Sequence, residues 1–165
     1  MNIRLLLALP LAIMACGTCF AAPIASSSRA MGSGGAAVVG FWHLDVVIGP
    51  CDDPPNTHEF LALQNFNLGG TVSGSDTHPS SGQGSTSGLW SYDRGTHRYT
   101  VRQQFARFVD DVYDGLQDIH INDMALSPDG EDLAGDVDAF MLNTDGSVRA
   151  ELCGTVTGER VHMDD

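Results

Sequence analysis

The sequence predicts an all-β domain, an eight-stranded antiparallel up-and-down barrel. Turn signals recur at short intervals, apolar and polar residues alternate between them, and no segment shows a sustained helical period. Consecutive hairpins produce a meander, and closing a long meander into a barrel removes its exposed edges. The eight strands are predicted near residues 40–49, 58–66, 70–75, 88–93, 97–109, 116–127, 132–142 and 147–162.

Seven connections separate these strands, and glycine, proline and aspartate mark each of them. Three are Asp-Gly pairs, which favour hairpins because both residues tolerate positive φ. The turns are expected at 49–56, 67–70, 93–95, Asp114-Gly115, Asp129-Gly130 and Asp145-Gly146, with a long Ser/Gly-rich loop at 73–88.

Alternation assigns the faces of the first and last strands. Inward positions of the first strand are Trp42, Leu44, Val46 and Ile48. Those of the last strand are Val148, Ala150, Leu152, Gly154, Val156, Gly158 and Arg160. Arg160 is the one charged member, and an inward charge requires a partner.

The G-x-W pattern of Gly40-Phe41-Trp42, together with Arg160 in the last strand, resembles the calycin superfamily, which includes lipocalins and avidin-like proteins. The resemblance implies that Trp42 closes one end of the barrel and that Arg160 lies across its ring as a structural pair. From Val38 to Val161 the chain also resembles uncharacterised exported bacterial barrel proteins, through Gly40-Phe41-Trp42, Phe66, Gly69-Gly70-Thr71, Gly88-Leu89-Trp90, Cys153 and Arg160. The middle-strand motif of many lipocalins is missing, so the resemblance implies no ligand class.

Residues 1–21 read as a signal peptide, with Arg4, an apolar segment at 5–15 and small residues before a cleavage site after Ala21. A lipoprotein signal with Cys16 as the acylated residue is the alternative. Residues 22–37 form a flexible Ala/Ser/Gly linker, and 38–165 form the barrel. The protein is therefore expected to be secreted or periplasmic.

Removal of the signal peptide leaves two of the four cysteines, Cys51 and Cys153. An oxidising compartment and an even count favour a disulfide. In a closed meander the end of the first strand lies beside the start of the last one. Both side chains are predicted on the outer face, so the disulfide should join the two strands where the barrel closes.

Charge excludes several classes of partner. The chain has 8 Lys+Arg, all of them Arg, against 21 Asp+Glu, a net charge of −13. Nucleic acids and anionic membranes require a basic surface, so neither is expected. Charged outward faces argue against a membrane-spanning barrel. A monomer is expected.

No metal ion or other cofactor is predicted. The six histidines have no ligand spacing. Asp110, Asp111 and Asp114 crowd one predicted turn, but they lack the pattern of a calcium loop. No nucleophile motif occurs, so no catalytic residue is nominated.

The interior contains candidates for a ligand pocket, although core filling is the simpler role for the aromatic ones. His120 belongs to the set only if its strand turns Leu116, His120 and Met124 inward, which Ile119 and Ile121 contest. Small inward residues of the last strand, Ala150, Gly154 and Gly158, favour a cavity. The candidates are Trp42, Leu44, Val46, Trp90, Tyr92, Tyr99, Phe105 and His120.

The sequence favours an exported, non-enzymatic barrel that binds a small, apolar molecule. One alternative is a protein-interaction barrel, such as a periplasmic protease inhibitor. The other is an isomerase or cyclase on the same fold. An enclosed apolar cavity would favour the first of these functions.

Overall fold

The computed structural model describes residues 35–53, 56–77 and 82–163. The predicted signal peptide, residues 1–21, lies outside the described residues. So does the predicted linker as far as residue 34.

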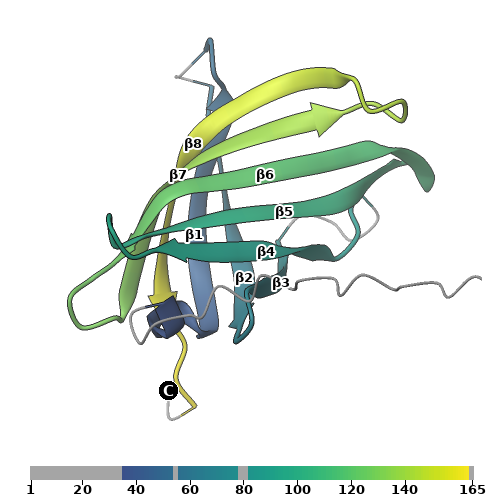
Figure 1. Cartoon of the computed structure of the whole chain (residues 1–165). Coiled ribbons are helices and arrows are strands. Elements are labelled where there is room, and N and C mark those ends of the chain that lie inside the picture. Colours follow the sequence, from purple (N-terminus) through teal and green to yellow (C-terminus); the bar gives the residue numbers. More distant parts are fainter. Residues whose placement is uncertain (1–34, 54–55, 78–81, 164–165) are drawn as a thin grey trace, which may run out of the picture.

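The strands form one closed antiparallel barrel in chain order, which confirms the predicted fold class (Figure 1). Each strand pairs with the next along the chain, and the last strand pairs with the first. The strands are β1 (Gly40–Pro50), β2 (His58–Asn67), β3 (Thr71–Asp76), β4 (Thr86–Asp93), β5 (Arg98–Val109), β6 (Val112–Leu126), β7 (Asp132–Leu142) and β8 (Val148–Arg160). A single 3₁₀ turn, η1 (Gly35–Val38), precedes β1 in the described part of the chain.

One predicted turn is wrong. The β5–β6 hairpin turns at Asp110 and Asp111, whose φ angles are 50° and 62°, and not at Asp114-Gly115. Two aspartates in the left-handed region make a tight two-residue hairpin. Asp114 is instead an extra residue in a bulge, because Arg107 pairs with Gly115 while Phe108 pairs with Tyr113.

Gly115 is required at this bulge. Its φ is 117°, and an added Cβ would lie 2.0 Å from the carbonyl oxygen of Leu142. The Asp-Gly signal therefore marks a position of positive φ inside β6, four residues after the point where the chain reverses.

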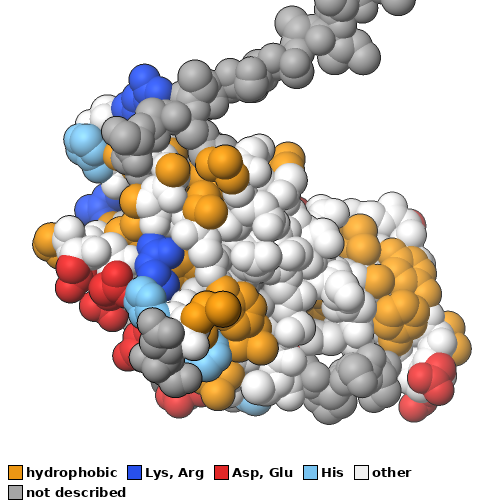
Figure 2. All heavy atoms as spheres, turned by 90° about the horizontal axis from the view of Figure 1, so that it is seen from below, with side chains coloured by type: hydrophobic (Ala, Val, Ile, Leu, Met, Phe, Trp, Pro, Cys, Tyr) orange, Lys and Arg blue, Asp and Glu red, His pale blue; other side chains and the backbone are white. Residues whose placement is uncertain are grey.

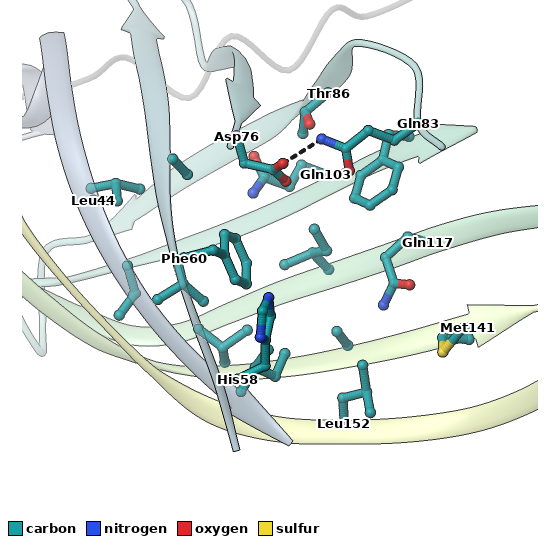
Figure 3. Close-up of a pocket in the computed structure, with 18 of the residues that line it drawn as sticks. Leu44, His58, Phe60, Asp76, Gln83, Thr86, Gln103, Gln117, Met141 and Leu152 are labelled. Atoms are coloured by element: carbon teal, nitrogen blue, oxygen red, sulfur yellow. Dashed lines mark hydrogen bonds between the residues drawn. The ribbon is translucent and has the colours of Figure 1, made fainter. Parts of the chain in front are cut away.

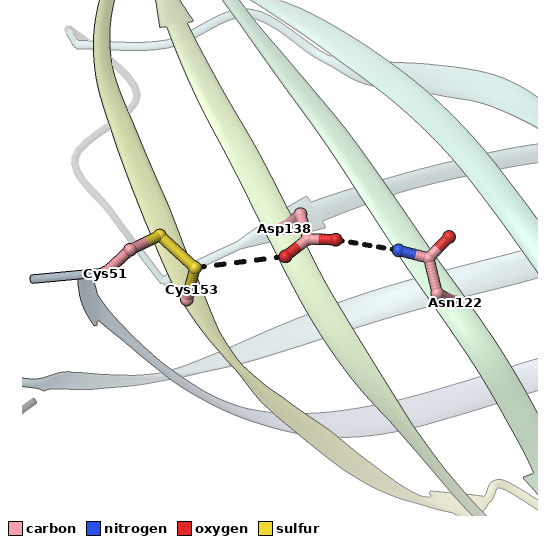
Figure 4. The surroundings of a disulfide bond; sticks show 4 residues. All are labelled: Cys51, Asn122, Asp138 and Cys153. Carbon is pink, nitrogen blue, oxygen red and sulfur yellow. Dashed lines mark hydrogen bonds between the residues drawn. A yellow bond between two sulfur atoms is a disulfide. The ribbon is translucent and has the colours of Figure 1, made fainter.

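The barrel closes between β1 and β8, from the pair Trp42–Arg160 to the pair Pro50–Leu152. The predicted disulfide joins Cys51 to Cys153 with a Cα–Cα distance of 4.9 Å, on the outer face (Figure 4). The Sγ atom of Cys153 lies 3.9 Å from Oδ1 of Asp138. The disulfide therefore links β1 and β8 covalently at the end of their pairing that lies farthest from Trp42.

The end of the barrel at Trp42, which we call the closed end, contains fully buried core residues. Trp42 is fully buried, and its Nε1 donates a 2.9 Å hydrogen bond to the carbonyl oxygen of Val38. The guanidinium carbon of Arg160 lies 4.3 Å from the centre of the Trp42 ring, as predicted. Residues 35–37, which sequence analysis assigned to the linker, belong to η1 at this end.

The surface is mixed in character. On the face seen in Figure 2, Arg, Asp, Glu and His side chains lie interspersed, and hydrophobic side chains gather in separate patches. The Arg side chains on this face do not form a continuous basic surface, as nucleic-acid binding would require.

Candidate functional site

A cavity of about 590 Å³ occupies the other end of the barrel. It extends from Leu44 and Gln64 in the middle of the barrel to Pro50 at the end of β1 and Gly82 after β3. Cavities of roughly 300–1,000 Å³ hold drug-sized molecules. We call this the open end, in contrast to the closed end at Trp42.

One half of the cavity wall is apolar. Among the described residues, every side chain that β7, β8 and β1 contribute to the lining is apolar. These three strands are adjacent, because the barrel closes between β8 and β1. The side chains include Leu44, Val46, Ile48, Val137, Ala139, Met141, Leu152 and Val156.

The other half, formed by β2 to β6 and their connections, contains polar side chains among the apolar ones. Asp76, Gln83, Thr86 and Gln103 gather on one side of the cavity, and Met141 and Leu152 lie on the other (Figure 3). Further polar members of the lining are Asn56, His58, Gln64, Ser75, Arg107 and Gln117.

Several of these polar groups are buried without a complete set of hydrogen bonds. Gln64, Gln103 and Arg107 are only 4%, 5% and 8% exposed. Gln64 Oε1, Gln103 Oε1 and Arg107 Nη1 have no hydrogen-bond partner among the described residues. Buried polar groups are normally paired, so these three atoms leave hydrogen-bonding capacity unused in the wall of the cavity.

The charge of Arg107 is partly balanced by the carboxylate of Asp114, the bulged residue of β6. Its Nη2 donates to the carboxylate of Asp114 and, at 3.3 Å, to the carbonyl oxygen of that residue. Arg149 donates to the same carboxylate, at 2.7 Å and 3.0 Å. The hydrogen bonds from Arg149, and then those from Arg107, hold the pKa of Asp114 below its ordinary value of 3.8. Two cations thus share one carboxylate.

Residues 82–84, which precede β4, lie beside the cavity. Gly84 donates its backbone N–H to the carbonyl oxygen of Ala106 at 2.7 Å, and Phe108 donates to Gly82 at 2.9 Å. The side chain of Gln83 donates to Asp76 (Figure 3). These bonds hold residues 82–84 against the end of β5, beside Arg107.

The structure divides the predicted ligand-pocket residues between the two ends. Leu44, Val46 and Phe105 line the cavity. The others, except His120, lie at the closed end and fill the core with aromatic side chains: Trp42, Trp90, Tyr92 and Tyr99.

His120 does not line the cavity. Ile119 and Ile121 point into it, so His120 lies on the outer face, where its ring contacts Phe140 and Nε2 is 3.2 Å from the Asp118 carboxylate. The bulge between Asn122 and Ala125 shifts the alternation, which is why Met124 is nevertheless buried. The reading that placed His120 and Met124 on one face is therefore wrong.

The small residues of β8 do not create the cavity. A Cβ on Gly154 would lie 1.9 Å from the carbonyl oxygen of Val47, and one on Gly158 would lie 2.3 Å from Cδ2 of Leu44. These glycines allow β1 to approach closely. The expectation that Gly154 and Gly158 leave room for a ligand is therefore wrong.

Sequence reasoning missed the polar residues of the cavity, although a signal for them was present. The inward positions of β5 are Tyr99, Val101, Gln103, Phe105 and Arg107, at a strict spacing of two. Tyr99 and Phe105 are already candidates, and the same spacing of two along this strand also places Gln103 and Arg107 on the inner face.

The fold and this site define a class of protein: a closed eight-stranded barrel with one filled end and one hollow end. No protein-family model matches the chain, and no curated protein matches it as a relative.

Within the described residues, no helix has the length and apolar character needed to cross a membrane. The same residues contain no cluster of three or more His, Cys, Asp or Glu side chains suited to a metal ion.

Proposed function

We propose that this protein is an exported, calycin-like barrel that binds a small, largely apolar molecule in its cavity and catalyses no reaction. The cavity of about 590 Å³ is the observation that supports the proposal. A protein-interaction barrel needs no such space, so the cavity favours small-molecule binding over that alternative.

The contrast between the two ends supports the same function. Trp42 and Arg160 seal one end, so a ligand would enter at the other, beside Pro50 and Gly82. Apolar ligand surface buried in the cavity would contribute about 25 cal/mol per Å² to binding.

Export is the second part of the proposal. Residues 1–21 would be removed as a signal peptide, and residues 22–37 would link the mature N-terminus to the barrel. The disulfide between Cys51 and Cys153 is consistent with an oxidising compartment. We propose that the mature protein is secreted or periplasmic and monomeric.

A neutral fluorescent probe, N-phenyl-1-naphthylamine, tests binding. Its fluorescence should rise on addition of the purified mature protein and saturate at one probe per chain. Ala139→Phe places a ring in the cavity and should abolish the rise, because Ala139 lines the apolar half. Ala134→Phe is the matched control, since Ala134 is exposed on the same strand. Equal fluorescence with both variants would contradict the proposal.

A further inference from the structure

We infer that the ligand is a facially amphipathic acid, apolar along one side, with hydrogen-bonding groups along the other and a carboxylate at the Arg107 end. This inference rests on the proposed function, since it assumes that the cavity binds a small molecule. The observation behind it is the one-sided distribution of polar groups around the cavity wall.

The apolar half determines one side of the ligand. The lining side chains of β7, β8 and β1, such as Val137, Leu152 and Val46, offer no hydrogen bond. A polar group against them would lose its water and gain nothing, which costs free energy. The ligand therefore presents a hydrocarbon face to these strands.

The polar half determines the opposite side. Gln64, Thr86, Gln103 and Gln117 come from four different strands, and each is at least nine-tenths buried. The Oε1 atoms of Gln64 and Gln103 have no partner among the described residues. Each glutamine side chain can turn to present either its oxygen or its N–H₂ group, so hydroxyl groups on the ligand fit both.

Arg107 determines the end of the ligand. Asp114 is the one carboxylate that the described structure places between Arg107 and Arg149, and it already accepts hydrogen bonds from both. Nη1 of Arg107 has no partner. A second carboxylate, supplied by the ligand, would pair this nitrogen and balance the second cation.

The other acid of the lining, Asp76, does not pair this nitrogen. Its Oδ1 accepts a hydrogen bond from Gln83, and Nη1 of Arg107 has no partner among the described residues. A carboxylate of the ligand would therefore be placed at Arg107, on the β5 side.

Two common ligand types fit this wall less well. A linear fatty acid satisfies Arg107 but leaves the glutamines unpaired. A sugar pairs the glutamines but presents hydroxyl groups to Val137 and Leu152. A rigid acid with its hydroxyl groups on one face satisfies both halves, and deoxycholate has this chemistry.

Four competitors test the inference on the mature wild-type protein, each displacing N-phenyl-1-naphthylamine below the concentration at which micelles form. Deoxycholate should displace the probe at a concentration at least tenfold lower than the other three require. 5β-Cholanate has the same skeleton and carboxylate but no hydroxyl group. The methyl ester of deoxycholate lacks the charge, and dodecanoate lacks the polar face.

Variants assign each preference to a residue. Gln103→Leu should remove most of the preference for deoxycholate over 5β-cholanate. Arg107→Met should remove the preference for deoxycholate over its methyl ester, and Arg107→Lys should restore part of it. Gln104→Leu and Arg102→Met are the matched controls, because both residues are exposed on the same strand, and they should change neither preference.

The outcomes separate the inference from the proposed function. If the probe does not bind, the proposed function fails. If the probe binds but all four competitors displace it equally, or none does, or 5β-cholanate or dodecanoate displaces it best, the inference fails and the proposed function stands.

Discussion

The two ends of the barrel each contain an inward arginine, and the two arginines differ in their partners. At the closed end Arg160 donates to the carbonyl oxygens of Gly130, Val39 and Ala37, at 3.0, 2.9 and 2.5 Å, and lies over Trp42. At the open end, Nη2 of Arg107 reaches Asp114, and Nη1 has no partner among the described residues. Each nitrogen of Arg160 thus has an acceptor within the protein, whereas one nitrogen of Arg107 has none among the described residues.

The aromatic side chains follow the same division. At the closed end Trp90 is 6.4 Å from Phe66 and 6.0 Å from Tyr99, and Tyr99 is 4.8 Å from Tyr92, measured between ring centres. At the open end, Phe60 and Phe105 line a cavity of about 590 Å³. Core packing is therefore concentrated at one end of the barrel, and the cavity lies at the other.

The largest expected loss of stability comes from a substitution at the closed end. Trp42→Ala should lower the free energy of unfolding by about 3–5 kcal/mol, because it leaves a cavity in a packed core and removes the ring beneath Arg160. Phe105→Ala should cost only about 1–2 kcal/mol, because Phe105 is half-buried and already borders a cavity. Urea unfolding followed by circular dichroism measures both, and equal losses would show that the two ends are packed alike.

Most of the closed end could be predicted from the sequence. Seven of the eight strands begin within two residues of their predicted positions, because each turn is set by local residues such as Asp129-Gly130. The contact between Trp42 and Arg160 followed from their inward positions in paired strands and from the resemblance. Only β6 begins four residues early, because two aspartates and not a glycine form its turn.

The open end could be predicted only in part. Spacing places Gln103 and Arg107 inside the barrel, but it does not show whether the interior is filled, because filling depends on side chains from all eight strands together. The pairing of Arg107 with Asp114 depends on a bulge, and a bulge shifts the alternation on which sequence reasoning relies.

The second prediction concerns the covalent link at the open end. Cys153→Ser in a Cys51→Ser background should lower the free energy of unfolding by about 2–4 kcal/mol, since the disulfide restricts the unfolded chain across a separation of 102 residues. Thermal unfolding of the oxidised wild type and the double variant measures the loss. Reduction of the wild type should reproduce it, and a double variant as stable as the oxidised protein would contradict this expectation.

The third prediction has the opposite sign. Gln103→Leu should leave the stability of the ligand-free protein unchanged or raise it by up to about 1 kcal/mol, because it removes a buried amide oxygen that has no partner. Gln104→Leu, on the exposed face of the same strand, is the control and should have little effect. A fall of more than about 1 kcal/mol in the free energy of unfolding, measured in urea, would show that Gln103 stabilises the fold. The open end would then resemble the closed end, where inward polar groups are structural.

The last prediction compares two aspartates whose pKa values are lowered for different reasons. At the open end the guanidinium of Arg149, followed by that of Arg107, lowers the pKa of Asp114. At the closed end the hydroxyl of Ser127, followed by the backbone of Glu131, lowers the pKa of Asp129. In both cases the pKa in the folded protein lies below that in the unfolded chain. Each carboxylate therefore stabilises the fold above the unfolded value of 3.8, and the stabilisation is lost as the pH falls through the folded pKa.

Salt distinguishes the two causes. Asp114→Asn and Asp129→Asn should each lower the melting temperature at neutral pH, and both differences from the wild type should shrink on acidification. Added sodium chloride should reduce the Asp114→Asn difference at neutral pH, because ions screen the attraction between Asp114 and Arg149, whose side chain is 41% exposed. The Asp129→Asn difference should change less, because Asp129 accepts its hydrogen bonds from a neutral hydroxyl and a backbone N–H. Equal salt dependence of the two differences would mean that the charge of Arg107 and Arg149 is not what stabilises Asp114, and that Arg107 is a weaker anchor for a ligand carboxylate than its position indicates.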